Sequence, residues 1–289
     1  MAATRRLIAR KVVAVVGHFC SAASMSASRF YAEAGIVQIS PASTNPAFTE
    51  NRPGRGVFRV VAADGQQGSF AGKYMAEKFK GRPLAIISDG TSYGDVLAGG
   101  VRDALKRAGA NLTIDETVSS EESSVAAVVS RLPAYNIAAV YMAGYHETAG
   151  VIARQVRKRG LTPQLFGSDA LVTNGFRRFA GDASEGTLMT FIADAERNPA
   201  AKRLVKELRA RGLRSTGYVI YAYAAVDIWA DAVQWASSTE YNKVADAIMG
   251  TDRVTVIGRI RFDENGDLKD PPLEWFVWRM GKYIPVERQ

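Results

Sequence analysis

Cysteine and histidine are scarce in this sequence, and their scarcity excludes several kinds of site. One cysteine, Cys20, occurs in 289 residues, so neither an internal disulfide nor a multi-cysteine zinc site can form within the chain. The two histidines, His18 and His146, lie far apart in the sequence, which disfavours a histidine-based metal centre. We therefore predict a protein without a metal site.

Long apolar runs and nucleotide-binding motifs are missing as well. No apolar stretch approaches the roughly 18–20 residues that a membrane-spanning helix needs. Neither G-x-G-x-x-G nor G-x-x-x-x-G-K-[ST] occurs, so we predict no cofactor. The net charge of +8 comes from Lys and Arg spread along the chain. The densest basic stretch, residues 4–11, is interpreted as a solvated helix face, and we expect no nucleic-acid partner.

The N-terminal stretch RRLIARKVVAVVG superficially follows the pattern of an export signal. Its apolar core, Val12–Val16, is shorter than the roughly 7–15 residues of a signal peptide's hydrophobic region, and the small-residue cleavage pattern is missing. We interpret residues 12–17 as a buried strand that follows the end of a helix. No export signal is therefore visible in this chain.

Short β-branched segments alternate with amphipathic segments as far as residue 193. Several of the β-branched segments are apolar without alternation, as expected when helices cover both faces of a parallel sheet. Helical spacing of apolar residues is found in 69–81, 95–110 and 146–160. This alternation predicts right-handed βαβ units in doubly wound sheets. The predicted strands are 12–16, 36–40, 57–62, 84–88, 112–118, 138–143, 164–168 and 187–192.

The pattern changes after residue 193. Three helical segments are expected first, followed by two strand segments that each contain a hairpin turn, at Asn265-Gly266 and at Met280-Gly281. The predicted helices are about 198–211, 216–237 and 240–250, and the predicted strand segments are 256–268 and 273–286.

Polar residues follow five of the predicted strands. Ligands of open parallel sheets bind beyond the carboxyl ends of the strands. The residues found there offer hydroxyl donors suited to a carboxylate and one carboxylate suited to an ammonium, which indicates recognition of a zwitterion. Each also has a simpler interpretation as a helix cap, a turn residue or a cleft aromatic. They are Ser21, Ser43 and Thr44, then Tyr93, Tyr145 and Asp169.

Several stretches resemble the periplasmic binding proteins for branched-chain amino acids, which are type I solute receptors of ABC transporters. VVGHFCSAASMSASRFYAEAGIVQISPASTNP is similar to their first lobe. LAIISDGTSYGDVLAGGVRDALKRAGAN, VYMAGYHETAGVIARQVRKRGL and GDASEGTL are similar to the second lobe. YVIYAYAAVDIWADAV and VIGRIRFDENGDLK are similar to the return into the first lobe. The order and spacing of these stretches carry the resemblance over nearly the whole chain.

The resemblance implies an α/β protein of two doubly wound, Rossmann-like lobes joined by three crossovers, with the ligand in the cleft between them. Lobe one would comprise 1–62 and 194–272, and lobe two 63–193 and 273–289. By position, Ser21 and Thr44, with the backbone of Ala42, would bind the ligand carboxylate, and Asp169 the ammonium. The other expected ligand-binding residues are Ser43, Ala170, Tyr93, Tyr145, Tyr218, Phe19 and Cys20.

The resemblance also implies what the protein does and where. It would capture a small branched-chain or aliphatic L-amino acid as a monomer, without enzymatic activity, and present its closed form to an ABC permease in the inner membrane. The full-length form would be periplasmic. Family members reach the equivalent of Val12 only after two βα units, so about 50–60 residues would be absent and lobe one would be incomplete. Cysteines at the position of Cys20 pair upstream, so Cys20 is expected to be an unpaired thiol beside the ligand side chain.

Two alternatives remain open from the sequence. The same fold serves receptors for amides, urea or aromatic acids, and the side-chain pocket cannot be read from one sequence. An α/β enzyme that uses Cys20 or His18 is a second alternative, although a reactive cysteine needs a base or a positive neighbour.

Overall fold

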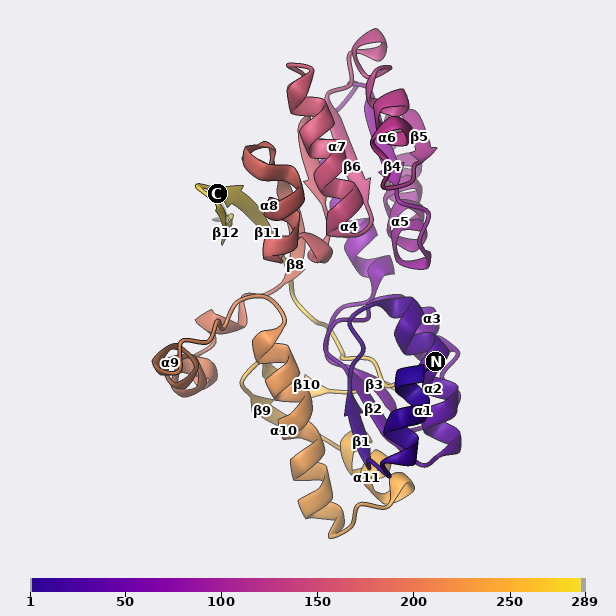
Figure 1. The fold of residues 1–289 in the computed structure, drawn as a ribbon, viewed down its shortest axis with the longest axis vertical. Coiled ribbons are helices and arrows are strands. Elements are labelled where there is room, and N and C mark those ends of the chain that lie inside the picture. The colour runs from indigo at the N-terminus through magenta and orange to yellow at the C-terminus, as the bar shows by residue number, and fades with distance from the viewer. Residues whose placement is uncertain (1, 287–289) are drawn as a thin grey trace. The chain divides into compact units, whose positions relative to one another are not determined.

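A computed structural model describes residues 2–286, which form two compact units (Figure 1). Unit 1 comprises the chain up to Ala63 together with Asp194–Pro271, and unit 2 comprises Asp64–Ala193 and the chain from Pro272 onward. Residues 287–289, which the sequence analysis assigns to lobe two, lie outside the described residues. Within residues 2–286, no helix has both the length and the apolar character that crossing a bilayer requires.

Unit 1 contains a parallel three-stranded sheet in the order β1-β2-β3 and a separate antiparallel pair, β9 and β10. Because β1 and β2 are neighbours and parallel, the segments that follow them leave the same edge of the sheet. The elements of unit 1 are α1 (Ala2–Ala9), β1 (Ala14–Val16), α2 (Ser21–Glu33), β2 (Val37–Ser40), α3 (Ala47–Glu50), β3 (Val57–Arg59), α9 (Lys202–Ala210), α10 (Val219–Ala236), α11 (Tyr241–Met249), β9 (Asp252–Thr255) and β10 (Gly258–Arg261).

Unit 2 contains a seven-stranded sheet in the order β12-β11-β8-β7-β6-β4-β5. Its strands β4 to β8 are parallel, and β11 and β12 continue the sheet antiparallel. The elements of unit 2 are α4 (Asp64–Lys78), β4 (Leu84–Ser88), α5 (Ser92–Arg107), β5 (Leu112–Thr117), α6 (Glu122–Val129), β6 (Ala139–Ala143), α7 (His146–Lys158), β7 (Gln164–Gly167), α8 (Asn174–Ala180), β8 (Leu188–Ile192), β11 (Leu273–Arg279) and β12 (Lys282–Pro285).

The strand order of unit 2 creates a switch point. From β4 the chain goes to β5 on one side of β4, and then to β6 on its other side. The segments that follow β4 and β6 therefore diverge from each other, which opens space at the carboxyl ends of these strands. The polar residues after β4, β6 and β7 all lie at this edge.

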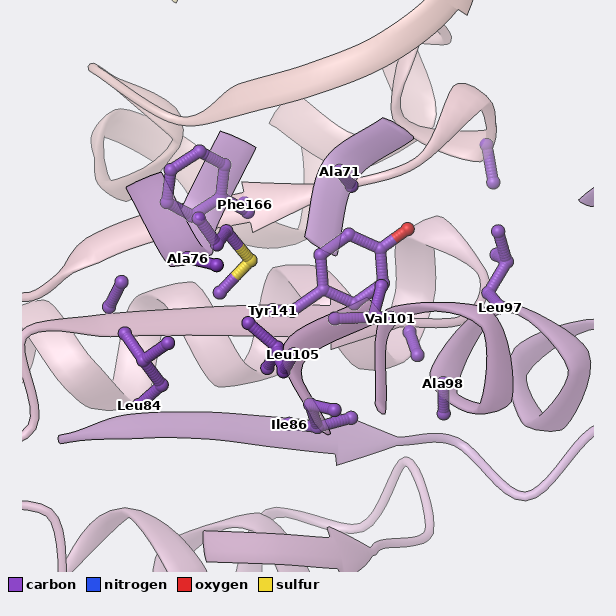
Figure 2. Packing of buried hydrophobic residues seen from close by; sticks show 14 of the residues in the cluster. Ala71, Ala76, Leu84, Ile86, Leu97, Ala98, Val101, Leu105, Tyr141 and Phe166 are labelled. Carbon is purple, nitrogen blue, oxygen red and sulfur yellow. The ribbon is translucent and has the colours of Figure 1, made fainter. Parts of the chain in front are cut away.

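The core of unit 2 forms where α4 and α5 cover the central strands (Figure 2). Tyr141 on β6 lies among Val101, Leu105 and Ala71 in this view, and its side chain is fully buried. Glycine lets the two helices approach closely: a Cβ on Gly72 would lie 2.6 Å from the Cβ of Ala104. Each large apolar side chain buried in this way contributes about 1.5–3 kcal/mol to folding.

Each of the eight strands predicted before residue 193 contains an observed strand, and the hairpin turn at Met280-Gly281 joins β11 to β12. The segment 256–268, predicted as strands around a hairpin turn, is a strand only in part. It contains β10, which pairs with β9 around a two-residue turn at Val256-Ile257. The Thr255 hydroxyl makes this turn, because it accepts from the Ile257 N–H (3.2 Å) and donates to the Gly258 carbonyl (2.9 Å). The Asn265-Gly266 turn is flanked by a single bridge between Phe262 and Leu268.

Candidate functional site

The turn after β2 and the start of α2 are joined in unit 1. The Ser21 hydroxyl accepts a hydrogen bond from the Asn45 N–H (3.3 Å), and Ser21 is buried. Cys20 stands at the N-cap of α2 and makes no side-chain capping bond. Ser21 therefore does not cap its helix; it fixes the distance between α2 and the turn at 43–45.

Ser43 fastens this turn to the chain beside β1. Its hydroxyl donates to the His18 carbonyl (3.0 Å) and shares a hydrogen bond with the Ser24 hydroxyl (2.7 Å). The N–H groups of Ala42 and Ser43 both donate to the Ser40 hydroxyl, at 3.3 and 2.8 Å. The polar groups of Ser43 thus hold the turn in shape.

Thr44 differs from its neighbour. It is 2% exposed, and within residues 2–286 its hydroxyl oxygen has no hydrogen-bond partner. A buried polar group without a partner costs about 1–3 kcal/mol, so this hydroxyl is suited to meet a polar group of a ligand. Ser21, Ala42, Ser43 and Thr44 are the residues that the sequence analysis predicts for a ligand carboxylate, and we call them the carboxylate subsite.

Two aromatic side chains of unit 1, Phe19 and Tyr218, form a ring contact, and Phe19 lies close in sequence to Ser21. The ring of Phe19 is 41% exposed and meets the ring of Tyr218 edge to face, with the centroids 5.5 Å apart. Tyr218 is the residue directly before α10, so the two rings come from distant parts of the chain. Cys20 carries a free, exposed thiol. Phe19 and Tyr218 provide an apolar surface in unit 1.

Tyr93, Tyr145 and Asp169 come together at the switch point of unit 2. They follow the adjacent strands β4, β6 and β7. The Tyr93 hydroxyl donates to Asp169 Oδ1 (2.6 Å), and the rings of Tyr93 and Tyr145 lie with centroids 4.8 Å apart. The Ala170 N–H donates to the Tyr93 hydroxyl oxygen (3.3 Å). Asp169 is 5% exposed and is the first residue of the short helix Asp169–Leu171, whose N-cap residue is Ser168.

Gln67 on α4, which the sequence analysis does not identify, is hydrogen-bonded to Asp169. Its side-chain N–H donates to Asp169 Oδ1 (2.8 Å), while its carbonyl oxygen accepts from the Asp169 N–H (2.9 Å) and from the Thr190 hydroxyl. The same side-chain nitrogen lies 3.5 Å from Asp64 Oδ1. Gln67 thus fixes both the backbone and the carboxylate of Asp169. Asp169 is predicted to bind a ligand ammonium, and we call it, together with Gln67, Tyr93 and Tyr145, the ammonium subsite.

The electrostatics of this region favour a cation. Asp64 and Asp169 are both buried, at 0% and 5% exposure. Burial and these two carboxylates raise the pKa of Tyr141 well above its usual range. The Tyr141 phenol is therefore neutral at physiological pH. A ligand group that carries a positive charge would be attracted to the carboxylates of this region.

Asp89 holds the backbone of this site in place. Its Oδ2 accepts from the Tyr145 N–H (2.7 Å), and its Oδ1 accepts from the N–H (3.0 Å) and the hydroxyl (2.6 Å) of Thr91. Thr91 in turn caps α5, because its hydroxyl accepts from the Gly94 N–H. One carboxylate therefore connects the segments that follow β4 and β6.

Comparison with known proteins identifies the family. The sequence profile of the periplasmic binding proteins matches residues 1–273. The chain belongs to this family. The Leu/Ile/Val-binding protein homolog 1 of Brucella suis is 38% identical over 268 residues, which cover 92% of this chain and 72% of that protein. The amino acid binding protein of Pseudomonas aeruginosa is 37% identical over 287 residues, which cover 98% of this chain and 76% of that protein.

Solved structures agree with the fold of this periplasmic binding protein. A leucine binding protein from Thermotoga maritima superposes with a TM-score of 0.90 at 25% sequence identity, over 99% of this chain and 82% of that one. The predicted type I receptor fold, with two doubly wound α/β units, is confirmed by this similarity.

The enzyme alternatives find little support in the geometry. His18 Nε2 forms a hydrogen bond with the Tyr31 hydroxyl (3.1 Å) rather than with Cys20. Residues 90–94, Gly-Thr-Ser-Tyr-Gly, match the nucleophile-elbow pattern G-x-S-x-G between a strand and a helix, a match that the sequence analysis does not identify. His146 Nε2 lies 3.6 Å from Glu147 Oε1. The family is one of solute receptors.

A pH dependence of stability follows from His18. Burial beside Tyr31 lowers the pKa of its imidazole. The unfolded chain then takes up the proton at higher pH than the folded chain, so stability falls as the pH drops through about 6.5. We expect the free energy of unfolding, measured with urea between pH 7.5 and 5.5, to decline more steeply for the native protein than for His18→Gln. Equal slopes would contradict this role for His18.

Proposed function

We propose that this periplasmic binding protein captures a small branched-chain or aliphatic L-amino acid for an ABC importer. The observation that carries the proposal is the buried Asp169 carboxylate, which accepts hydrogen bonds from Gln67 and Tyr93, while the Tyr93 ring packs against the Tyr145 ring. A carboxylate that is fixed and buried in this way is suited to an ammonium group, because an opposite charge offsets its desolvation. The names of the relatives in Brucella suis and Pseudomonas aeruginosa support an amino acid as the ligand.

The two subsites match the two charged ends of such a ligand. The unpartnered hydroxyl of Thr44 and the start of α2 would bind the carboxylate, and Asp169 would bind the ammonium. Tyr93 and Tyr145 would pack against the ligand, and Phe19, Cys20 and Tyr218 would contact its side chain. Ala170 is buried, its N–H donates to the Tyr93 hydroxyl oxygen, and its methyl group would limit the space for the ligand.

The charge of the ammonium subsite argues against the alternative ligands. An aromatic acid or a simple amide carries no cation, so it would not gain the attraction that a buried carboxylate offers to an ammonium group. We therefore favour an amino acid over an amide, urea or an aromatic acid.

The role in transport follows from the receptor family. We propose that the protein acts as a monomer in the periplasm, in its full-length form, and passes its ligand to an inner-membrane ABC permease. No step of this role requires bond making or breaking, and we propose no catalytic activity.

Isothermal titration calorimetry tests the proposed function directly. The purified protein should bind leucine, isoleucine or valine with a dissociation constant of about 10 μM or lower, which corresponds to about −7 kcal/mol or better. Leucinamide, which lacks the carboxylate, and 4-methylvalerate, which lacks the amine, should each bind at least about 100-fold more weakly. Binding of benzoate or urea in place of all amino acids would contradict the proposal.

A further inference from the structure

Arg59, the last residue of β3, is a charged side chain with no exposed surface. A fully buried guanidinium is rare and requires that its N–H donors be satisfied. Arg59 meets this requirement within unit 1: its Nε and Nη2 pair with the Asp267 carboxylate, and Nη2 also donates to the Thr49 hydroxyl. The remaining guanidinium nitrogen, Nη1, donates to backbone carbonyl groups in the turn that contains the carboxylate subsite.

The guanidinium holds the carbonyl groups on both sides of Thr44. Nη1 donates to the Asn45 carbonyl (2.8 Å) and to the Ser43 carbonyl (3.3 Å), and Nη2 lies 3.4 Å from the Pro46 carbonyl. In a planar trans peptide, the N–H of one residue points opposite to the carbonyl of the residue before it. The Thr44 N–H therefore points away from Arg59 when the Ser43 carbonyl points toward it.

We propose that Arg59 is the positioning residue of the carboxylate subsite. It sets the peptide planes of residues 43–46, so that the Thr44 N–H and the unpartnered Thr44 hydroxyl are presented together to the ligand carboxylate. The ligand does not contact Arg59 itself. This inference rests on the proposed amino-acid function.

The opposite side of Arg59 is anchored by the turn at 263–267. The Arg59 N–H donates to the Gly266 carbonyl (3.0 Å), and the Asp267 N–H donates to Asp263 Oδ1 (2.9 Å). This anchor comes from a segment 208 residues further along the chain. Arg59 thus holds the ligand-binding turn against a part of unit 1 that is built from the returning chain.

Arg52 offers a matched control. It donates through Nη2 to the Glu264 carbonyl and through Nη1 to the Arg55 and Val57 carbonyls, so it supports the same 263–267 turn. It has no hydrogen bond to residues 43–46 within the described chain. A loss that arises only from loosening the fold of unit 1 would affect Arg52→Lys and Arg59→Lys alike.

The test is a double-mutant cycle of Arg59→Lys with Thr44→Val, read by leucine calorimetry and by hydrogen exchange of residues 41–47. Lysine keeps the charge beside Asp267 but cannot reach both carbonyls, so we expect Arg59→Lys to weaken binding roughly 10- to 100-fold. In the Thr44→Val background the same change should cost clearly less, because the hydroxyl, one of the two groups that Arg59 positions, is already absent while the N–H of residue 44 remains. Arg52→Lys should stay within about threefold of the native affinity.

The outcomes separate the inference from the proposed function. The role of Arg59 is overturned if the native protein binds leucine and Arg59→Lys lowers the affinity equally in the native and Thr44→Val backgrounds. It is also overturned if Arg59→Lys and Arg52→Lys lower the affinity equally. In both cases the proposed amino-acid function stands. A native protein that binds no amino acid overturns both. If Arg59→Lys does not fold, Thr49→Val replaces it in the cycle, since it removes one acceptor of Nη2 and keeps the side-chain volume. Unchanged affinity and unchanged exchange in that variant also overturn the inference.

Discussion

Asp169→Asn should lower the affinity for leucine by at least about 100-fold, the larger of the binding effects that we expect. Asparagine has the shape of aspartate and can still accept from Tyr93 and Gln67, so the subsite keeps its geometry. What is lost is the negative charge that offsets a buried ammonium, and breaking a buried ion pair from one side costs about 3–5 kcal/mol. Isothermal titration calorimetry of leucine with the native protein and with Asp169→Asn measures the ratio of the two dissociation constants.

Asp103→Asn is the matched control for this experiment. Asp103 is an exposed carboxylate on α5 of the same unit, and its replacement changes the net charge by the same amount. We expect the affinity of that variant to be unchanged at physiological salt, because exposed charges are screened. Undiminished leucine binding by Asp169→Asn, or an equal loss in both variants, would show that the ammonium is not bound at Asp169.

The sequence predicts that Asp169 lies at the binding edge of the sheet, but it does not predict that Gln67 is hydrogen-bonded to Asp169. Polar residues directly after buried strands mark the binding edge of a parallel sheet, and this rule finds Tyr93, Tyr145 and Asp169. Gln67 belongs to a helix, and its partner Asp169 lies 102 residues away. The helix also begins at Asp64, five residues before the predicted start at 69, so its first turn is read as loop from the sequence. Two glycines in that turn, Gly65 and Gly68, weaken the local helical signal.

The hydroxyl groups of Ser43 and Thr44 show a second limit of prediction from sequence. Ser43 and Thr44 have similar side chains and follow the same strand, so local sequence gives no reason to distinguish them. The structure separates them through the His18 carbonyl, which comes from 25 residues earlier in the chain and accepts from Ser43. Thr44 has no comparable acceptor within the described chain. Only the three-dimensional arrangement decides which hydroxyl holds the turn and which one is available to a ligand.

The largest expected effect on stability comes from Gly144→Ala. Gly144 follows β6 with φ +150°, a region that residues with a side chain rarely adopt. A Cβ at this position would lie 2.2 Å from Cγ of Asp89. The Asp89 carboxylate would have to move and would release the Tyr145 N–H and Thr91. We expect the free energy of unfolding to fall by about 3 kcal/mol or more, from backbone strain combined with the lost hydrogen bonds.

Gly160→Ala separates the two contributions to that loss. Gly160 also has a positive φ, +68°, but a Cβ there would meet nothing within 4 Å. Its replacement should therefore cost only the backbone term, about 1 kcal/mol. Urea unfolding followed by tryptophan fluorescence in a Trp229→Phe, Trp235→Phe background, which leaves only Trp275 and Trp278 on β11, reports on unit 2 in both variants. Equal costs for the two glycines would mean that the Asp89 contacts contribute little, and the Tyr145 backbone would then need another support. If the contacts matter as argued, Gly144→Ala should cost less in an Asp89→Ala background, because the colliding carboxylate is gone.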